Sequence, residues 1–146
     1  MELSNKSEYA ILALLELALC YPKGETLQIR EIAALQNIPN RYLEQLLATL
    51  RRRGLIKSIR GAKGGYMLAR EPEKITLLDA LYSMEGIDQV VAAYKPTIPT
   101  IEGEVIQAVW LEATQAANSV LEEYTLKDLC DRRAQQEKQK VLMYYI

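Results

Sequence analysis

The sequence contains no histidine and only two cysteines, Cys20 and Cys130. Two cysteines are too few for the disulfide framework of a small secreted protein, and they fit a reducing intracellular setting better. The most apolar stretch, residues 9–21, contains Glu16 and is too short to span a bilayer. No charged segment with a cleavage-site pattern precedes it, so we expect no export signal and a cytoplasmic protein.

Catalytic chemistry also lacks its usual residues. The chain offers no nucleophile–base pair and no metal-ligand spacing, and acidic pairs such as Glu122 with Glu123 are typical of a solvated helix face. The glycine-rich segment 61–65 lacks the strand-to-helix context and the Lys-Ser/Thr of a phosphate loop. We therefore expect no enzyme and no cofactor.

Positive charge is concentrated in the first half of the chain, although the net charge is only −1. Residues 1–72 carry eleven Lys/Arg against seven Asp/Glu, a net charge of +4, and residues 73–146 carry seven against twelve, a net charge of −5. Within 41–63 there are seven basic residues and one acid, Glu44. Such an excess is expected where a polyanion docks, although a solvated charged face would look the same.

Helical periodicity predicts three helices in the first half. The first begins at Ser4 or Asn5, where Asn5 and Glu8 have the form of a capping box, and ends before Pro22. The second covers 29–36, with an apolar face formed by Ile29, Ile32, Ala33 and Leu35. The third covers 40–53, after a turn containing Pro39 and before Gly54.

The period then changes from helix to strand. Residues 55–60 and 66–69 read as two short strands around the glycine-rich turn 61–65, which predicts a β-hairpin. Three helices followed by a hairpin predict a winged helix-turn-helix over residues 1–75. The fold class is therefore mainly α with a small β-hairpin.

Residues 76–146 are predicted to form a linker helix, a loop, a long helix and a C-terminal tail. Thr76 caps a helix through Met84 that Gly86 closes, and 87–103 reads as a loop. Residues 104–124 form the longest helical pattern, and their apolar residues recur at steps of four and three. This seam predicts dimerisation, with packing on its own domain as the alternative; it contains Ile106, Trp110, Ala113, Ala117, Val120, Leu121 and Tyr124.

The third helix carries the candidate base-reading residues. In a helix-turn-helix the second helix of the motif enters the major groove and contacts bases near its N-terminus, where Asn40, Arg41, Glu44 and Gln45 lie off the apolar stripe. Arg can bind guanine, Gln adenine, and Glu can accept from cytosine. The basic run 51–53 includes Arg51 and Arg52, and these would complement the helix dipole even without DNA.

The hairpin turn carries two long cations, Arg60 and Lys63, between small residues. A narrow minor groove has an enhanced negative potential and accepts an arginine of this kind. The position of the turn after three helices favours a DNA-binding wing.

Residues 42–66 resemble the Rrf2 family of transcription regulators. The resemblance rests on YLEQL at 42–46, LR at 50–51, GLI at 54–56, SIRG at 58–61 and GGY at 64–66. It extends to 3–10 and 75–86, fades in the loop, and returns at 125–126 and at the C-terminus. Its best-known members are the iron–sulphur cluster regulator and the repressor of cysteine metabolism.

The resemblance implies a homodimer, paired through its long helices, that binds a palindromic operator in double-stranded DNA. It implies that Glu44 and Gln45 face bases, that Arg60 enters the minor groove, and that the N-terminal segment lies near phosphates. The DNA-binding residues are therefore expected to be Lys6, Ser7, Tyr9, Asn40, Arg41, Glu44, Gln45, Arg51, Arg52, Ser58, Arg60, Gly61, Lys63, Gly64 and Tyr66.

The sequence departs from the cluster-binding members of the family. Those members carry three cysteines in the loop after the fourth helix, whereas residues 86–104 here contain none. Cys20 and Cys130 alone cannot fill the four positions that an iron–sulphur cluster usually needs. We expect no cluster, with a cluster shared between protomers or completed by carboxylates as the alternative.

The branch that represses cysteine metabolism matches better, because it lacks the cysteine-rich loop and ends in an aromatic segment closing on isoleucine. Here the end contains Tyr144, Tyr145 and Ile146. In that branch the regulator associates with cysteine synthase, whose pocket for an amino-acid carboxylate can capture a chain terminus. These three residues either dock in cysteine synthase or pack back on their own domain.

Two further readings stay open at this stage. A winged helix can serve protein contacts alone, although the basic residues of the third helix and turn favour DNA. Alternatively, Cys20 or Cys130 could make the regulator redox-responsive, which requires an exposed thiol of lowered pKa. Repression is expected by analogy with small DNA-binding dimers.

Overall fold

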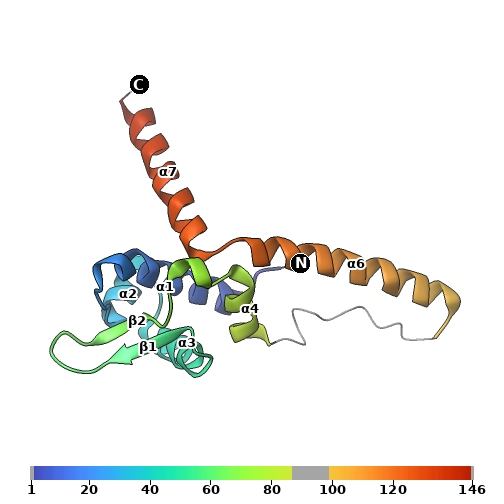
Figure 1. Ribbon diagram of the computed structural model, residues 1–146, viewed down its shortest axis with the longest axis horizontal. Helices are drawn as coiled ribbons and strands as arrows, with labels where there is room; N and C mark the ends of the chain where they lie inside the picture. The colour runs from blue at the N-terminus through green and yellow to red at the C-terminus, as the bar shows by residue number, and fades with distance from the viewer. Residues whose placement is uncertain (1, 87–98, 146) are drawn as a thin grey trace.

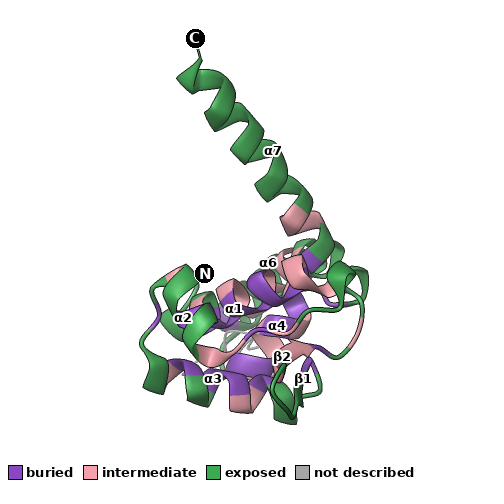
Figure 2. Ribbon diagram, turned by 90° about the vertical axis from the view of Figure 1, so that its left-hand side faces the viewer, coloured by how far each residue is buried: buried purple, intermediate pink, exposed green. Residues whose placement is uncertain are grey.

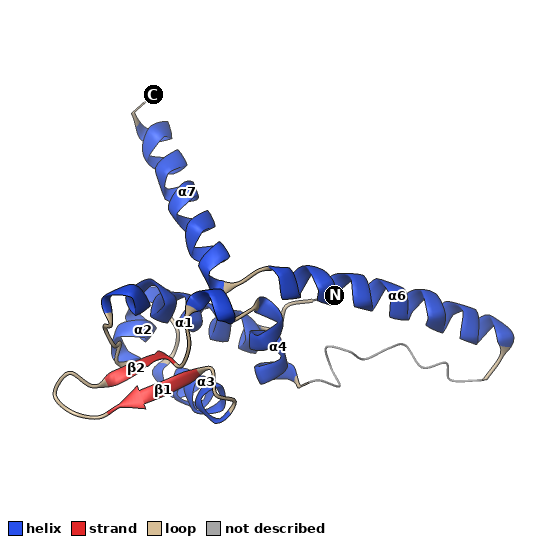
Figure 3. Cartoon of the chain, in the orientation of Figure 1, coloured by secondary structure: helices blue, strands red, loops and turns tan. Residues whose placement is uncertain are grey.

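The computed structural model describes residues 2–86 and 99–145. In the described part, a two-stranded sheet follows three helices in the sequence and precedes three more (Figures 1 and 3). The elements are α1 (Asn5–Cys20), α2 (Ile29–Gln36), α3 (Asn40–Arg52), β1 (Ile56–Ile59), β2 (Gly65–Leu68), α4 (Leu77–Glu85), α6 (Ile101–Glu123) and α7 (Leu126–Tyr144), with 3-10 turns at Tyr21–Lys23 and Pro72–Lys74.

The first helix begins where expected but is capped differently. Ser4 occupies the N-cap, and its Oγ accepts a hydrogen bond from the backbone N–H of Ser7 at 3.1 Å. Asn5 is therefore the first helical residue, and the capping box predicted between Asn5 and Glu8 is wrong. A serine hydroxyl at the N-cap satisfies a free helical N–H as well as Asn5 would one residue later.

A single hydrophobic core forms around α1. Helix α2 contributes Ile32 and Ala33, and α3 buries its leucines against α1 as the sequence predicts. Leu35, expected on the apolar face of α2, is instead 57% exposed. At ~100° per residue it lies about 110° from the direction shared by Ile32 and Ala33, which sets the buried face. The buried apolar residues of α1 and α3 are Ala10, Ala13, Leu14, Leu17, Ala18, Leu43, Leu46, Leu47 and Leu50.

The hairpin pairs antiparallel, with Ile56 opposite Leu68 and Ile59 opposite Gly65. A third segment joins it, because Leu27 and Tyr66 exchange two backbone hydrogen bonds of 3.0 and 2.7 Å. The wing, residues 56–68, is therefore attached to the connection between α1 and α2. It lies beside α3 at the lower side of the molecule in Figure 3.

Helices α4 and α7 begin side by side. Each starts with a capping box, Thr76 with Asp79 and Thr125 with Asp128, and the backbone of Leu126 donates to the carbonyl of Ile75 at 2.9 Å. Leu126 is fully buried in the same core as α1 to α3. The core therefore crosses the domain boundary predicted at residue 75, and that boundary stays a prediction.

The two long C-terminal helices leave this domain in different directions (Figure 1). Thr100 caps α6 by accepting from the N–H of Gly103 at 3.0 Å, so the predicted loop over 87–103 is wrong for 101–103, and 87–98 lie outside the described residues. The segment expected to be a tail is helix α7. Figure 2 shows α7 exposed over nearly its whole length.

Candidate nucleic-acid interface

The N-terminal part of α3 presents a polar face to solvent. Asn40, Arg41, Glu44 and Gln45 are all exposed, because the buried leucines of the helix face the opposite direction. Their positions off the apolar stripe agree with the sequence. Their contacts with bases stay a prediction. Amide, guanidinium and carboxylate groups are thus accessible to solvent near the start of a helix that packs against the core.

The C-terminal part of α3 is strongly basic. Arg51, Arg52 and Arg53 are exposed, and the Arg52 guanidinium donates to Thr49 Oγ1 at 3.2 Å within the same helix. Positive side chains at this end also complement the helix dipole. These arginines therefore favour the helix itself, and the contacts of Arg51 and Arg52 with DNA stay a prediction.

The tip of the wing exposes its cations, Arg60 and Lys63, and the strand residue Ser58. The connection between α1 and α2 holds the tip in place, because Thr26 Oγ1 donates a hydrogen bond to the carbonyl of Lys63 at 2.9 Å. Gly61 has φ = +115°, a conformation that other residues rarely adopt. The tip is therefore slim and attached at both ends.

Gly64 and Gly65 serve the packing of the wing. A Cβ on Gly64 would lie 2.4 Å from the Ile59 carbonyl oxygen, and a Cβ on Gly65 would lie 2.6 Å from that of Leu27. Only glycine lets the three backbones approach this closely. Close backbone packing therefore accounts for the two adjacent glycines. Any contact of Gly64 with DNA stays a prediction.

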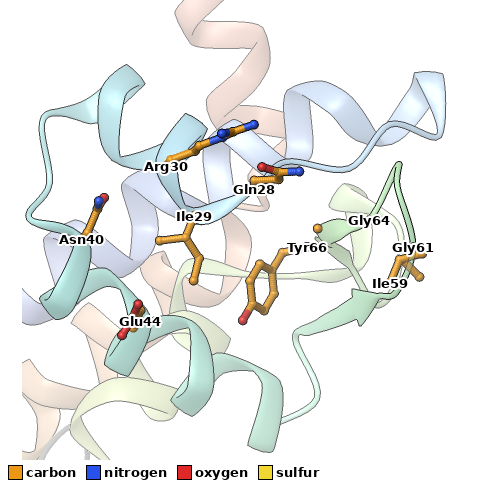
Figure 4. Close-up of a pocket in the computed structure, with 10 residues that line it drawn as sticks. Gln28, Ile29, Arg30, Asn40, Glu44, Ile59, Gly61, Gly64 and Tyr66 are labelled. Atoms are coloured by element: carbon orange, nitrogen blue, oxygen red, sulfur yellow. The ribbon is translucent and has the colours of Figure 1, made fainter.

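An open groove of about 450 Å³ separates α3 from the wing (Figure 4). Ile29 and the wing residue Tyr66 lie between the α3 residues on one side and the tip of the wing on the other, and both are half-buried. The sequence did not single out Gln28, Ile29 or Arg30, which reach this groove from the start of α2. The lining residues are Gln28, Ile29, Arg30, Asn40, Glu44, Ile59, Gly61, Gly64, Gly65 and Tyr66.

The N-terminal segment divides into an exposed and a buried part. Lys6 is exposed, whereas Tyr9 is half-buried and meets Tyr42 of α3 edge-on, with ring centroids 5.6 Å apart. Ser7 is only 1% exposed, and its Oγ donates to Glu85 Oε1 at 2.8 Å. The hydroxyl of Ser7 is therefore turned into the protein, and we withdraw Ser7 from the predicted interface.

Glu85 joins the end of α4 to the start of α1. Its carboxylate accepts from Ser4 and Ser7, and these two hydrogen bonds hold its pKa below the ordinary value for glutamate. Burial acts in the opposite direction and Lys6 nearby acts in the same direction, each with a smaller effect. This network sets the N-terminus of α1, and with it Lys6 and Tyr9, relative to α4.

The predicted dimerisation seam on α6 is split. Ile106, Trp110 and Val120 are 52–57% exposed, and Ala113 is also exposed. Ala117, Leu121 and Tyr124 are half-buried within the chain. The Tyr124 ring lies under the Arg132 guanidinium at 4.6 Å, and its hydroxyl accepts from Arg132 at 3.0 Å.

Tyr144 and Tyr145, at the end of α7, are 92% and 86% exposed. The alternative in which they pack back on the domain is therefore not the arrangement of this chain. Ile146 lies outside the described residues. Among the described residues, no helix is long and apolar enough to cross a membrane.

The two free thiols lie on α1 and α7. Cys20 on α1 and Cys130 on α7 are both half-buried against the core. Burial is the main cause that raises the pKa of each thiol, and neighbouring carboxylates, Glu25 and Asp131, raise it further. Such thiols stay protonated at neutral pH and are poor nucleophiles and metal ligands.

The chain is similar to known regulators over its whole length. The model of the Rrf2 family, described as an iron-dependent transcriptional regulator, matches residues 3–132. The HTH-type transcriptional regulator CymR of Bacillus subtilis (strain 168) is 36% identical over 146 residues, the full length of both chains. The structure of CymR, the global cysteine regulator of B. subtilis, has a TM-score of 0.79 at 33% identity and covers 90% of this chain and 98% of its own. The IscR of T. potens has a TM-score of 0.75 at 34% identity and covers 91% and 88%.

The description of the family as iron-dependent can be tested against the donors of this chain. Cys20 and Cys130 lie on different helices, and among the described residues no group of three or more Cys, Asp or Glu could hold a metal ion. The residues that the structure describes therefore do not fit an iron site. The match in sequence and fold does not depend on one, and relatives in this family are transcription regulators rather than enzymes. The chain belongs to the Rrf2 family and is a helix-turn-helix, DNA-binding transcription regulator.

Proposed function

We propose that the protein binds a palindromic operator as a homodimer, with α3 in the major groove and the wing in the adjacent minor groove. The observation that carries the proposal is the open groove between α3 and the wing. Arg30 lines this groove, and the exposed Arg41 and Arg60 are sequence neighbours of its lining residues Asn40 and Gly61. Glu44 is the one acidic residue among those that line it. The sugar–phosphate backbone between a major and a minor groove has the shape and charge to cross it.

Each part of this face has its own role in the proposal. Glu44 and Gln45 read base edges, Arg60 inserts into the minor groove, and Lys6 contacts a phosphate. We add Arg30, which is exposed in the first turn of α2 and lines the same groove. Phosphate contacts fix the register, and base contacts give specificity.

The exposed apolar residues of α6 support dimerisation through this helix. Trp110 and Ile106 on α6 are more than half exposed, a cost that a second copy would remove. At ~1.5 Å per residue the 23 residues of α6 are roughly 34 Å long. Antiparallel pairing would separate the two winged domains by about that length, which matches half-sites one turn of DNA apart, about 34–36 Å.

We also propose that the regulator works without a bound iron–sulphur cluster, as a repressor, and in the cytoplasm, where its DNA lies. Support for the first point comes from the absence of cysteine over 86–104 and of histidine anywhere. Iron and acid-labile sulphide, measured on protein purified without oxygen, test it. Stoichiometric amounts of both would contradict it.

A second function concerns the C-terminus. Tyr144 and Tyr145 end an exposed helix that projects from the domain, and a relative 36% identical to this chain has a structure described as that of a global cysteine regulator. We propose that the end of the chain docks in cysteine synthase. Deletion of Ile146 should abolish binding to the purified enzyme in calorimetry, and an unchanged affinity would refute the proposal.

The DNA-binding proposal is tested by selecting genomic fragments with the purified protein. We expect one palindromic sequence to be enriched and binding to fall steeply with salt. Arg60→Ala should weaken binding about tenfold or more and reduce the salt slope by about one. Lys74→Ala is the matched control, because Lys74 is exposed but lies on the turn that packs beside α7.

Equal effects of Arg60→Ala and Lys74→Ala would mean that binding depends on total charge and not on the wing. Absence of any enriched sequence at low salt, with cysteine synthase also present, would favour a winged helix used only for protein contacts.

A further inference from the structure

The two C-terminal helices carry opposite charge. Helix α6 contains five Glu and no Lys or Arg, whereas α7 contains five Lys or Arg against three Asp or Glu. All five α6 glutamates are exposed. None of the four salt bridges among the described residues involves α6. The charge of α6 is therefore not neutralised within the described part of its own chain.

Helix α7 does not lie along its own α6. The two helices touch where Arg132 stacks on Tyr124, and beyond that junction they diverge (Figure 1). Helix α7 also leaves the domain on the side opposite α3 and the wing (Figures 1 and 2). Apart from Arg132 at this junction, the described cations of α7 therefore lie neither along their own α6 nor on the DNA-binding face.

The apolar surface of α6 is wider than one partner helix covers. Besides the seam that contains Ile106 and Trp110, a second row at steps of four contains Ile101, Val105 and Val109, which are 78%, 60% and 61% exposed. At ~100° per residue this row lies about a quarter turn from the seam. A helix pair buries only a narrow stripe, so the second row needs another surface.

We infer that α7 of each protomer packs across the N-terminal half of α6 of the second copy. The inference rests on the homodimer proposed above. Antiparallel pairing brings the first half of one α6 beside the end of the other, and α7 begins three residues after that end, at Leu126. The second row of one copy and α7 of the other therefore meet.

The chemistry of the two surfaces is complementary. Glu102 and Glu104 flank the second row, one on either side of it. Arg132 and Arg133 are exposed on the second turn of α7, where Arg132 contacts Tyr124 and Arg133 pairs with Glu137 at 3.2 Å. In the inferred contact their remaining N–H groups bind Glu102 and Glu104 of the second copy, and their aliphatic stems cover its Ile101. The long arginine side chains thus neutralise the α6 glutamates and also cover the second apolar row.

Charge-swapped variants test this contact between chains. One chain carries Glu102→Lys and Glu104→Lys, and the other carries Arg132→Glu and Arg133→Glu. Each variant alone places like charges at both α7–α6 contacts of its homodimer, and we expect its dimer dissociation constant to rise about tenfold. Mixed dimers have opposite charges at both contacts, so about nine-tenths of the dimers formed from an equal mixture should be mixed.

The control keeps the charge change and moves it along the helix. Glu112→Lys reverses an exposed glutamate at the midpoint of α6, away from either α7, and its mixture with the Arg132→Glu, Arg133→Glu chain should give only the statistical half of mixed dimers. Native mass spectrometry of two size-tagged chains counts the species, and circular dichroism confirms that each variant folds.

Two results would overturn the inference in distinguishable ways. Wild-type protein that sediments as a monomer would refute the proposed homodimer and, with it, this contact. A wild-type dimer whose swapped variants mix statistically would leave the homodimer standing and would show that α7 does not contact α6 of the second copy.

Discussion

The winged domain and the C-terminal helices use their apolar residues in opposite ways. In the winged domain the leucines of α3 and the small residues of α1 close one core, with Leu14, Leu43 and Leu47 fully buried. In α6 and α7, which total 42 residues, only Gly103 and Leu126 are buried. The first region buries its apolar residues within one chain, whereas the second leaves large apolar side chains exposed, as interaction surfaces do.

The two regions therefore control different properties of the protein. Burial within the domain positions α3 and the wing so that their cations can meet DNA. In the proposed homodimer, the exposed face of α6 sets how two such domains are spaced. A substitution should therefore affect either the stability of one chain or the association of two, according to the region that it touches.

The largest effect is expected in the core. Leu47→Ala removes a fully buried side chain and should lower the free energy of unfolding by about 2–5 kcal/mol, because a cavity remains. Val109→Ala, on exposed α6, should change it by less than about 0.5 kcal/mol in dissociated protein. Urea denaturation at low protein concentration measures both. Similar losses of unfolding free energy in the two variants would contradict the difference drawn between the two regions.

The next effect concerns association. Ile106→Ala with Trp110→Ala should raise the dimer dissociation constant by about 30-fold to 1,000-fold, because a buried tryptophan is typically among the residues that dominate an interface. Gln115→Ala, on the other side of α6, should leave it unchanged. Sedimentation equilibrium gives the constants, and a monomer–dimer equilibrium unaffected by the loss of Trp110 would place the interface elsewhere.

A smaller effect separates the two roles of the wing. Gly65→Ala places a Cβ 2.6 Å from the Leu27 carbonyl oxygen and should lower the free energy of unfolding by about 2–3 kcal/mol, since two backbones must part. Gly54→Ala has an open site at φ = +79° and should lose about 1 kcal/mol. Thermal unfolding compares them. Equal losses would mean that φ alone, and not the close approach, requires glycine at 65.

The smallest effect is a pH dependence at Glu85. Hydrogen bonds from Ser4 and Ser7 lower the pKa of its carboxyl in the folded state, so the ionised form stabilises the fold above the unfolded pKa, near ~4.3. This stabilisation is lost as the pH falls through the lower, folded-state pKa. The difference in unfolding free energy between wild type and Glu85→Gln should therefore be largest at neutral pH and disappear in acid. A difference that is constant with pH, or matched by the exposed Glu73→Gln, would contradict this account.

The winged domain is predictable because its periods change sharply. Leucines at helical spacing over 40–53 and the short apolar runs beside Gly61–Gly65 mark α3 and the hairpin within one or two residues. The ends of helices are less certain, since Ser4 and Asn5 both suit the cap of α1 and contacts beyond the segment decide between them.

Other features depend on tertiary contacts that no local pattern contains. The groove takes Gln28 and Arg30 from α2 because Leu27 pairs with Tyr66, a pairing across 39 positions. The burial of Ser7 depends on Glu85 at the far end of α4. Helix α7 could have been predicted from the capping box of Thr125 and Asp128, but its polar middle, 131–140, has no apolar period.

The central claim is that α6 holds two DNA-binding wings at the spacing of an operator. Hydroxyl-radical footprinting on the selected operator tests it most directly. We predict two protected patches related by a dyad, centred about 10 base pairs or a multiple of that apart on one face of the helix, and both lost together in Ile106→Ala with Trp110→Ala. A single protected patch at saturating wild-type protein would contradict the claim.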